Sequence, residues 1–184
     1  MIWDLPTFVN IDGANYAIRN KCDYRVVLDV ICALNDSDLN AEEKMRCALY
    51  IFYEDISSIK NLERAAREMY RIINGGEEVK IKPTKKPQVM DWEYDFKYIA
   101  PPISRVLGYD VRMPDRYCHF WTFLGAYMEI GECTFSTIVS IRSKRARGKK
   151  LEKWEMDFLR EHREIIDLPQ KLTAEEQDIL DSEW

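Results

Sequence analysis

The sequence is poor in the side chains that most often hold metals or act in catalysis, with 2 histidines and 5 cysteines among 184 residues. No two cysteines form a C-x-x-C pair, and their number is odd: they are Cys22, Cys32, Cys47, Cys118 and Cys133. At least three of them fall within apolar helical patterns, which favours reduced, buried thiols over a disulfide framework or a zinc site. We therefore expect no metal or other cofactor.

The motifs of several enzyme classes are also missing. There is no G-x-S-x-G, G-x-x-x-x-G-K-[ST], G-x-G-x-x-G or H-E-x-x-H motif and no EF-hand loop. Cys118 and His119 are neighbours, but adjacent helical residues point about 100° apart and cannot form a nucleophile–base pair by themselves. The acids Asp91, Glu93 and Asp95 lie where a helix is expected to begin, and the helix dipole explains them better than acid–base catalysis. We expect a protein that is not an enzyme.

Long apolar runs are absent too. No stretch approaches the roughly 18 residues that a membrane span requires, and the N-terminal residues lack the basic start and apolar core of a signal peptide. The sequence therefore predicts a cytoplasmic protein with no membrane partner. A net charge of −5 argues against a dedicated nucleic-acid binder, although the charge is unevenly spread.

What the sequence does contain is enough apolar surface for one folded domain. Hydrophobic residues make up 46% and aromatic residues 12%, which excludes general disorder. Residues 8–18 alternate apolar and polar side chains around Asp12-Gly13, and this pattern predicts a β-hairpin. A two-stranded hairpin is marginal alone, so it must pack on helices.

Four helices are predicted in the first 108 residues from their capping residues and apolar spacing. Each begins after a residue that caps well, and the second also has a capping box between Asn40 and Glu43. Their expected ranges are 24–34 after Asp23, 41–52 after Asn40, 62–73 after Asn61, and 92–107 after Asp91. Pro101-Pro102 should kink or break the fourth helix, because each proline removes an amide donor.

The stretch 115–164 looks like the centre of the fold. Asp115 is a good N-cap, and the run 118–128 is apolar on every face, as expected of a helix buried all round in which Trp121 and Phe123 are largely covered. A linking helix over 134–141 and an outer amphipathic helix of roughly four turns should follow. The apolar positions of the outer helix are Leu151, Trp154, Phe158 and Ile165.

The fold class is thus mainly α, a single domain of about six to seven helices over residues 1–168 with a small N-terminal β-hairpin. Residues 75–90 are rich in glycine, lysine and proline, which predicts a mobile linker. Residues 169–184 form an acidic C-terminal tail, in which the range 173–184 holds five acids and no base.

A basic block separates the linking helix from the outer helix, with six cations in residues 142–150. It could be a solvated helix end, a surface for an acidic partner, a phosphate-binding element for nucleic acid, or a site for the chain's own acidic tail. No aromatic side chain is interleaved with the cations, which weakens the nucleic-acid interpretation. The candidate partner-binding residues are Arg142, Lys144, Arg145, Arg147, Lys149, Lys150, Trp154 and Phe158.

Three segments of this region resemble the signature of a phage protein family. The runs 118–126, 132–138 and 141–144, together with the N-terminal hairpin and segments near residues 24–28 and 40–44, resemble the gene-product-fifteen family of long-tailed phages and prophages of Gram-positive bacteria. The likeness spans about residues 5–166. The family pattern often has tryptophan where this chain has Phe120, a departure that keeps the aromatic character.

The resemblance implies a role in tail assembly without catalysis. Such proteins are similar in gene position and size to chaperones that coat the tape measure protein while tail tube subunits polymerise around it in the host cytoplasm. The expected partner is the tape measure protein. Binding to the major tail protein and formation of a homo-oligomer are further possibilities that the resemblance leaves open. The alternative is a nucleic-acid-binding or regulatory phage protein that uses the basic 142–150 block.

Overall fold

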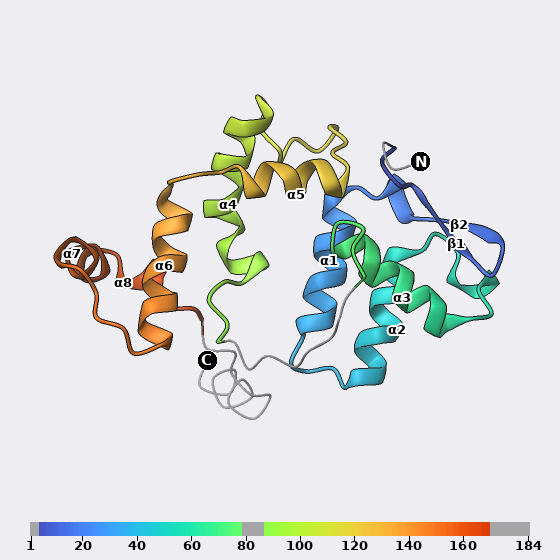
Figure 1. Ribbon diagram of the computed structural model, residues 1–184, viewed down its shortest axis with the longest axis horizontal. Coiled ribbons are helices and arrows are strands. Elements are labelled where there is room, and N and C mark those ends of the chain that lie inside the picture. Colours follow the sequence, from blue (N-terminus) through green and yellow to red (C-terminus); the bar gives the residue numbers. More distant parts are fainter. Residues whose placement is uncertain (1–3, 79–86, 170–184) are drawn as a thin grey trace, which may run out of the picture.

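The computed structural model describes residues 4–78 and 87–169 of the chain. Within these residues it contains eight α-helices, two short 3-10 helices and one two-stranded sheet, so the predicted mainly α class with an N-terminal hairpin is confirmed. Figure 1 shows the hairpin with α1–α3 at one end of the molecule and α6–α8 at the other, with α5 lying across the top between them.

The hairpin pairs β1, Phe8–Ile11, with β2, Ala14–Ala17, in antiparallel register. Asp12 and Gly13 both have positive φ, at 51° and 89°, as a tight two-residue turn requires. The turn is also held by the side chain of Asn10, which accepts a hydrogen bond from the Gly13 amide at 3.2 Å. Val9 and Ile11 are buried in the main core, so the hairpin is stabilised by packing on the helical layer.

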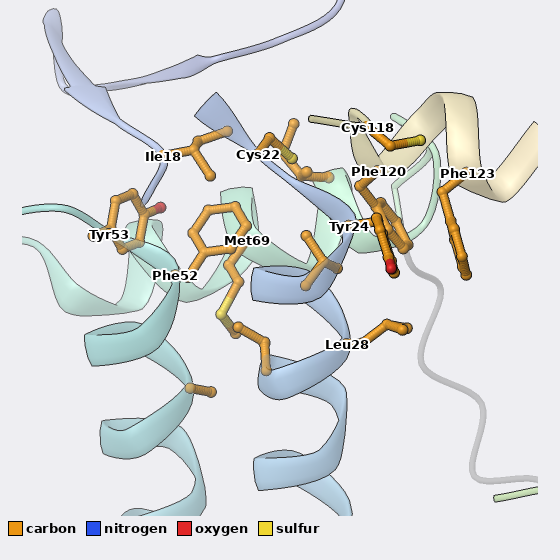
Figure 2. Packing of buried hydrophobic residues seen from close by; sticks show 14 of the residues in the cluster. Ile18, Cys22, Tyr24, Leu28, Phe52, Tyr53, Met69, Cys118, Phe120 and Phe123 are labelled. Atoms are coloured by element: carbon orange, nitrogen blue, oxygen red, sulfur yellow. The ribbon is translucent and has the colours of Figure 1, made fainter. Parts of the chain in front are cut away.

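The first helical layer consists of α1, Tyr24–Asn35, α2, Ala41–Phe52, and α3, Leu62–Ile73. Asp23, Asn40 and Asn61 each accept a backbone hydrogen bond at the helix start, and the predicted capping box between Asn40 and Glu43 is formed. Figure 2 shows residues from these helices, among them Phe52 and Met69, converging on one interior. These three helix predictions are confirmed to within a residue.

The fourth helix, α4, runs from Trp92 to Leu107 after its Asp91 cap and contains both prolines without a break. Of the predicted kink or break at Pro101-Pro102, the break does not occur. A proline inside a helix costs about 3 kcal/mol, but Ile99, Ala100, Pro102 and Ile103 are all buried on the face that packs into the core. Packing of this face outweighs the lost hydrogen bonds.

The fifth helix, α5, covers Phe120–Met128, so the predicted start at Asp115 is wrong. The residues before it are extended, because Cys118 accepts the Tyr24 amide and Cys22 accepts the Phe120 amide, both at 2.9 Å. The loop ahead of them is held by Arg25, whose guanidinium donates to the carbonyl oxygens of Val111, Met113 and Arg116. This long-range pairing overrides the local capping signal.

Only one face of α5 is buried, which corrects the prediction of burial all round. Phe120, Phe123 and Ala126 lie in the core, whereas Met128 is 71% exposed. The Phe123 ring stacks on the Tyr24 ring with centroids 4.4 Å apart (Figure 2). Trp121 is half-buried: its indole Nε1–H donates to the Ile72 carbonyl oxygen at 2.9 Å. Phe123 is therefore fully buried, as predicted, and Trp121 is covered less completely.

The last three helices are α6, Thr134–Ala146, α7, Lys153–Glu161, and α8, Arg163–Ile166. Helix α6 continues well past residue 141, so the first half of the basic block is helical. The predicted four-turn outer helix is interrupted at His162, whose φ of −130° and ψ of 38° are not helical. The interruption turns α8 back, so that it packs on both α6 and α7.

Two predicted segments lie partly or almost wholly outside the described residues. Of the predicted linker 75–90, residues 79–86 lie outside them, and the described flanks are in contact with the fold. An added Cβ at Gly76 would lie 3.1 Å from the Trp121 ring, and the Val89 carbonyl accepts a hydrogen bond from Arg142. Of the acidic tail, only Pro169 is described.

The five cysteines are free thiols, as expected, but they are not uniformly buried. Cys22 and Cys118 are buried, Cys32 and Cys133 are intermediate, and Cys47 is exposed. Burial raises the pKa of the Cys22 thiol to about 12, which leaves it protonated and unreactive at neutral pH.

Candidate partner-binding surface

Arg142 opens the basic block but does not face solvent. It is 6% exposed, and its guanidinium makes a two-pronged ion pair with Asp95 of α4, at 2.7 Å to Oδ2 and 3.0 Å to Oδ1. It also donates to the carbonyl oxygens of Ile165, Ile166 and Val89. Arg142 thus joins α4, α6 and α8, and its assignment as a partner-binding residue is corrected.

The next two cations of the block are also engaged within the fold. The Lys144 ammonium lies 2.7 and 2.8 Å from the two carboxylate oxygens of Glu155, a buried residue of α7. The hydrogen bond from Lys144 lowers the pKa of Glu155. Arg145 donates to Asp167 at 2.6 Å, and this bond lowers the pKa of Asp167. Both cations are partly accessible, but their charges are matched by these carboxylates.

The second half of the block is different. Arg147, Lys149 and Lys150 are exposed, and none of them forms an ion pair or hydrogen bond through its side chain within the described residues. They follow the end of α6, where Gly148 at φ 63° reverses the chain, and Lys153 follows at the start of α7. Cations at the C-terminal end of a helix are favoured by its dipole, yet these remain available to an acidic group from elsewhere.

The two aromatic candidates on α7 have different environments. Trp154 is 56% exposed and Met156 on the same helix is 44% exposed. Phe158 is half-buried against a small cluster formed by Ile138, Ile141 and Ile166, and its ring lies 4.6 Å from the ring of His162. Trp154 can therefore meet a partner directly, whereas Phe158 mainly closes the local core.

Sequence reasoning missed an apolar cleft between α1 and α4. The cleft has a volume of about 580 Å³. It is lined by Tyr24, Leu28, Cys32, Trp92 and Phe96 together with the charged residues Arg25, Asp29, Glu93 and Arg112. The pairs Tyr24/Leu28 and Trp92/Phe96 are each spaced i, i+4, and this spacing could have indicated a second apolar face on each helix.

Residues 2–168 match the family model described as Bacteriophage Gp15 protein. The chain belongs to this phage protein family. No curated protein and no solved structure matches this Gp15 chain.

The residues that carried the resemblance have structural roles in the Gp15 chain. His119 is 2% exposed and caps α5: its Nδ1 accepts the Trp121 amide at 3.0 Å, and its Nε2 lies 3.0 Å from the Pro6 carbonyl oxygen. Because an N–H donates to Nδ1, Nε2 must carry the proton of the neutral ring. Both ring nitrogens are thus engaged, and the Cys118 thiol contacts the His119 backbone oxygen and not the ring, so the two side chains are not paired as nucleophile and base. Burial also lowers the pKa of His119 and raises the pKa of the Cys118 thiol.

The described part of the Gp15 chain has neither a metal-binding cluster nor a membrane-spanning helix. Residues 4–78 and 87–169 contain no group of three or more histidine, cysteine, aspartate or glutamate side chains placed to hold a metal ion. Among the helices in these ranges, none has the length and apolar character to cross a membrane.

Proposed function

We propose that this Gp15 protein is a non-enzymatic tail assembly chaperone that binds the phage tape measure protein in the host cytoplasm. The observation that carries the proposal is the family match over residues 2–168, combined with the tail-assembly role that the resemblance to this family implies. A tape measure protein is long and helical, and exposed apolar helix surface aggregates unless it is shielded during assembly.

The surfaces of the chain suit a temporary partner. The exposed Trp154 and Met156 lie on α7 directly after the cations Arg147, Lys149 and Lys150, so apolar and charged groups alternate over a small area. A shielding protein must later leave, and a modest interface ringed by charge releases more readily than a large buried one. The apolar cleft between α1 and α4 offers further contact area.

The alternative, binding of nucleic acid through residues 142–150, has lost part of its basis. Arg142, Lys144 and Arg145 are paired with carboxylates inside the fold, which leaves half of the six cations free of pairing within the described chain. Nucleic-acid binding would appear as an affinity for DNA or RNA that falls steeply with salt. Strong salt-dependent binding of that kind would favour the alternative over the chaperone proposal.

Co-expression with the tape measure protein tests the proposal. The tape measure protein should remain soluble with the parent chain and aggregate without it. Arg147→Glu/Lys150→Glu should reduce its solubility, and the difference from the parent should be largest at low salt, because exposed charges assist association and are screened by salt. Arg46→Glu/Arg67→Glu changes the same amount of charge at exposed positions on α2 and α3 and should have no effect.

The outcomes separate the site from the function. If both double variants keep the tape measure protein soluble, the chaperone role stands and the partner site lies elsewhere, with the α1–α4 cleft as the next surface to test. If the parent chain itself has no effect on the solubility of the tape measure protein, the proposed function is wrong. Thermal unfolding should be unchanged in both variants, which excludes misfolding as a cause.

A further inference from the structure

Four exposed cations lie together where α6 ends and α7 begins. Arg147, Lys149, Lys150 and Lys153 fall within seven residues, with Glu152 as the only acid among them. None of the four side chains is ion-paired within the described residues, although the three cations before them in the block all are. We call these four residues the cationic turn.

The chain returns to this end of α6 before it leaves the described residues. Asp167 lies one residue after α8, and its carboxylate contacts Arg145 at 2.6 Å and Arg163 at 3.4 Å. Arg145 is in the last turn of α6, two residues before Arg147. Asp167 therefore lies close to the cationic turn, and the next residues, Leu168 and Pro169, lie beside Asn35 at the end of α1 and Asp91 at the start of α4.

That following segment is complementary in charge. Residues 173–184 contain five acids and no base, interspersed with the apolar residues Ile179, Leu180 and Trp184. Extended chain spans about 3.3–3.6 Å per residue, so the first of these acids, eight residues beyond Asp167, reaches the cationic turn from the Asp167–Arg145 contact. The neighbouring Trp154, 56% exposed, is an apolar contact for the apolar side chains.

We propose that residues 173–184 bind in cis to the cationic turn and to the exposed face of Trp154. Individual surface ion pairs contribute little, but a short covalent connection gives an effective concentration in the millimolar range, so several weak pairs suffice. The bound segment occupies the surface that an acidic partner would use. Such a partner must displace it, and the contact therefore sets a threshold for partner binding.

Zero-length carboxyl–amine cross-linking of the full chain, read by mass spectrometry, tests this contact. Carboxylates of residues 173–184 should cross-link to Lys149, Lys150 and Lys153 several-fold more than to the exposed control lysines Lys21, Lys60 and Lys97. At about 1 M salt the Debye length falls to about 3 Å, and the preference should be lost. Mixing isotope-labelled and unlabelled chains identifies cross-links within one chain.

Point variants sharpen the test while leaving the reporting lysines in place. Arg147→Glu should reduce the cross-links to Lys149 and Lys150 several-fold, and Trp154→Ala should reduce them without changing charge. Arg67→Glu, an equal charge reversal at an exposed position on α3, should leave them unchanged. An unchanged thermal unfolding temperature shows that each variant is folded.

A second measurement addresses occupancy of the surface. In a full chain with Glu175→Gln, Glu176→Gln, Asp178→Asn, Asp181→Asn and Glu183→Gln, the cationic turn should be free. A labelled peptide of residues 173–184 should then bind this variant several-fold more tightly than the native chain. Four results would each overturn the proposal. The cross-links could be spread equally over all exposed lysines, occur only to residues 80–86, or form only between chains. The peptide could also bind the variant and the native chain with equal affinity.

Discussion

The buried ion pair between Arg142 and Asp95 gives the sharpest test of how the C-terminal helices are held. Replacing Arg142 by methionine keeps much of the side-chain volume but removes five donated hydrogen bonds. Asp95, which is 0% exposed, would then retain, among the described residues, only the backbone donor of Asp91 at 2.9 Å. The carbonyl oxygens of Ile165 and Ile166 would also lose this donor, and with it the link from α6 to α8.

The expected cost follows from that burial. Removing one partner of a buried ion pair typically costs about 3–5 kcal/mol, because the other charge is left in the interior without compensation. The matched control is Arg145→Met, whose partner Asp167 has a 43% exposed side chain. An exposed pair contributes about 0–1 kcal/mol, so the control should change stability little.

Denaturant unfolding of both variants measures the difference, and amide exchange in α8 shows whether the link to α6 is lost locally. The double variant Asp95→Leu/Arg142→Met should recover part of the loss, because it removes the uncompensated charge as well. Recovery should be incomplete, since the three carbonyl oxygens still lack their donor. If Arg142→Met costs no more than Arg145→Met, the ion pair does not hold this end of the fold and our reasoning is refuted.

Two further predictions concern the region around α5. Burial lowers the pKa of His119 below its ordinary value of 6.5, so the neutral ring stabilises the folded state at pH values above 6.5, and this stabilisation is lost as the pH falls below 6.5. The unfolding free energy should therefore decrease between pH 7.5 and 5.5. The decrease should be smaller in His119→Asn, which keeps a capping side chain but does not titrate in this range. Trp121→Phe should cost about 0.5–1.5 kcal/mol through the hydrogen bond to Ile72, and Trp121→Ala about 2–3 kcal/mol, below the value for a fully buried tryptophan. If Trp121→Ala lowers the unfolding free energy by more than about 4 kcal/mol, Trp121 must be more deeply buried than the structure shows.

The sequence was a good guide wherever structure is set by neighbouring residues. The caps at Asp23, Asn40, Asn61 and Asp91 were predicted correctly, because a capping side chain bonds to amides two or three residues away. The Asp12-Gly13 turn is equally local. Such contacts depend little on the rest of the fold.

The failures have the opposite origin. Asp115 is of a residue type that caps helices well, but the residues after it form backbone hydrogen bonds with the segment around Cys22, nearly a hundred positions earlier in the chain. Pro101 and Pro102 remain within α4 because the buried face of that helix outweighs local propensity. Neither contact has a signature in the nearby sequence.

Arg142 is an intermediate case, because a usable signal was present. Phe135, Ile138 and Ile141 mark the inward face of α6, and Arg142 lies four residues after Ile138 on that same face. An arginine in that position needs a buried carboxylate, and helical spacing also turns Asp95 and Ile99 to one side of α4. Periodicity could have removed Arg142 from the candidate surface, although only the fold could show that Asp95 is its partner.

The division of the basic block into paired and unpaired halves bears directly on the proposed function. A chaperone surface has to be rigid enough to bind and weak enough to release, and one stretch of sequence meets both needs here. Arg142 and Lys144 fix α6 against α4 and α7 through carboxylates that are almost fully buried, so the end of α6 is held in place. The cations after it remain in solvent, where screening limits each contact to a small contribution. We therefore expect a partner to bind there reversibly, without a change in the fold, and we expect its affinity to depend on ionic strength and on competing acidic segments.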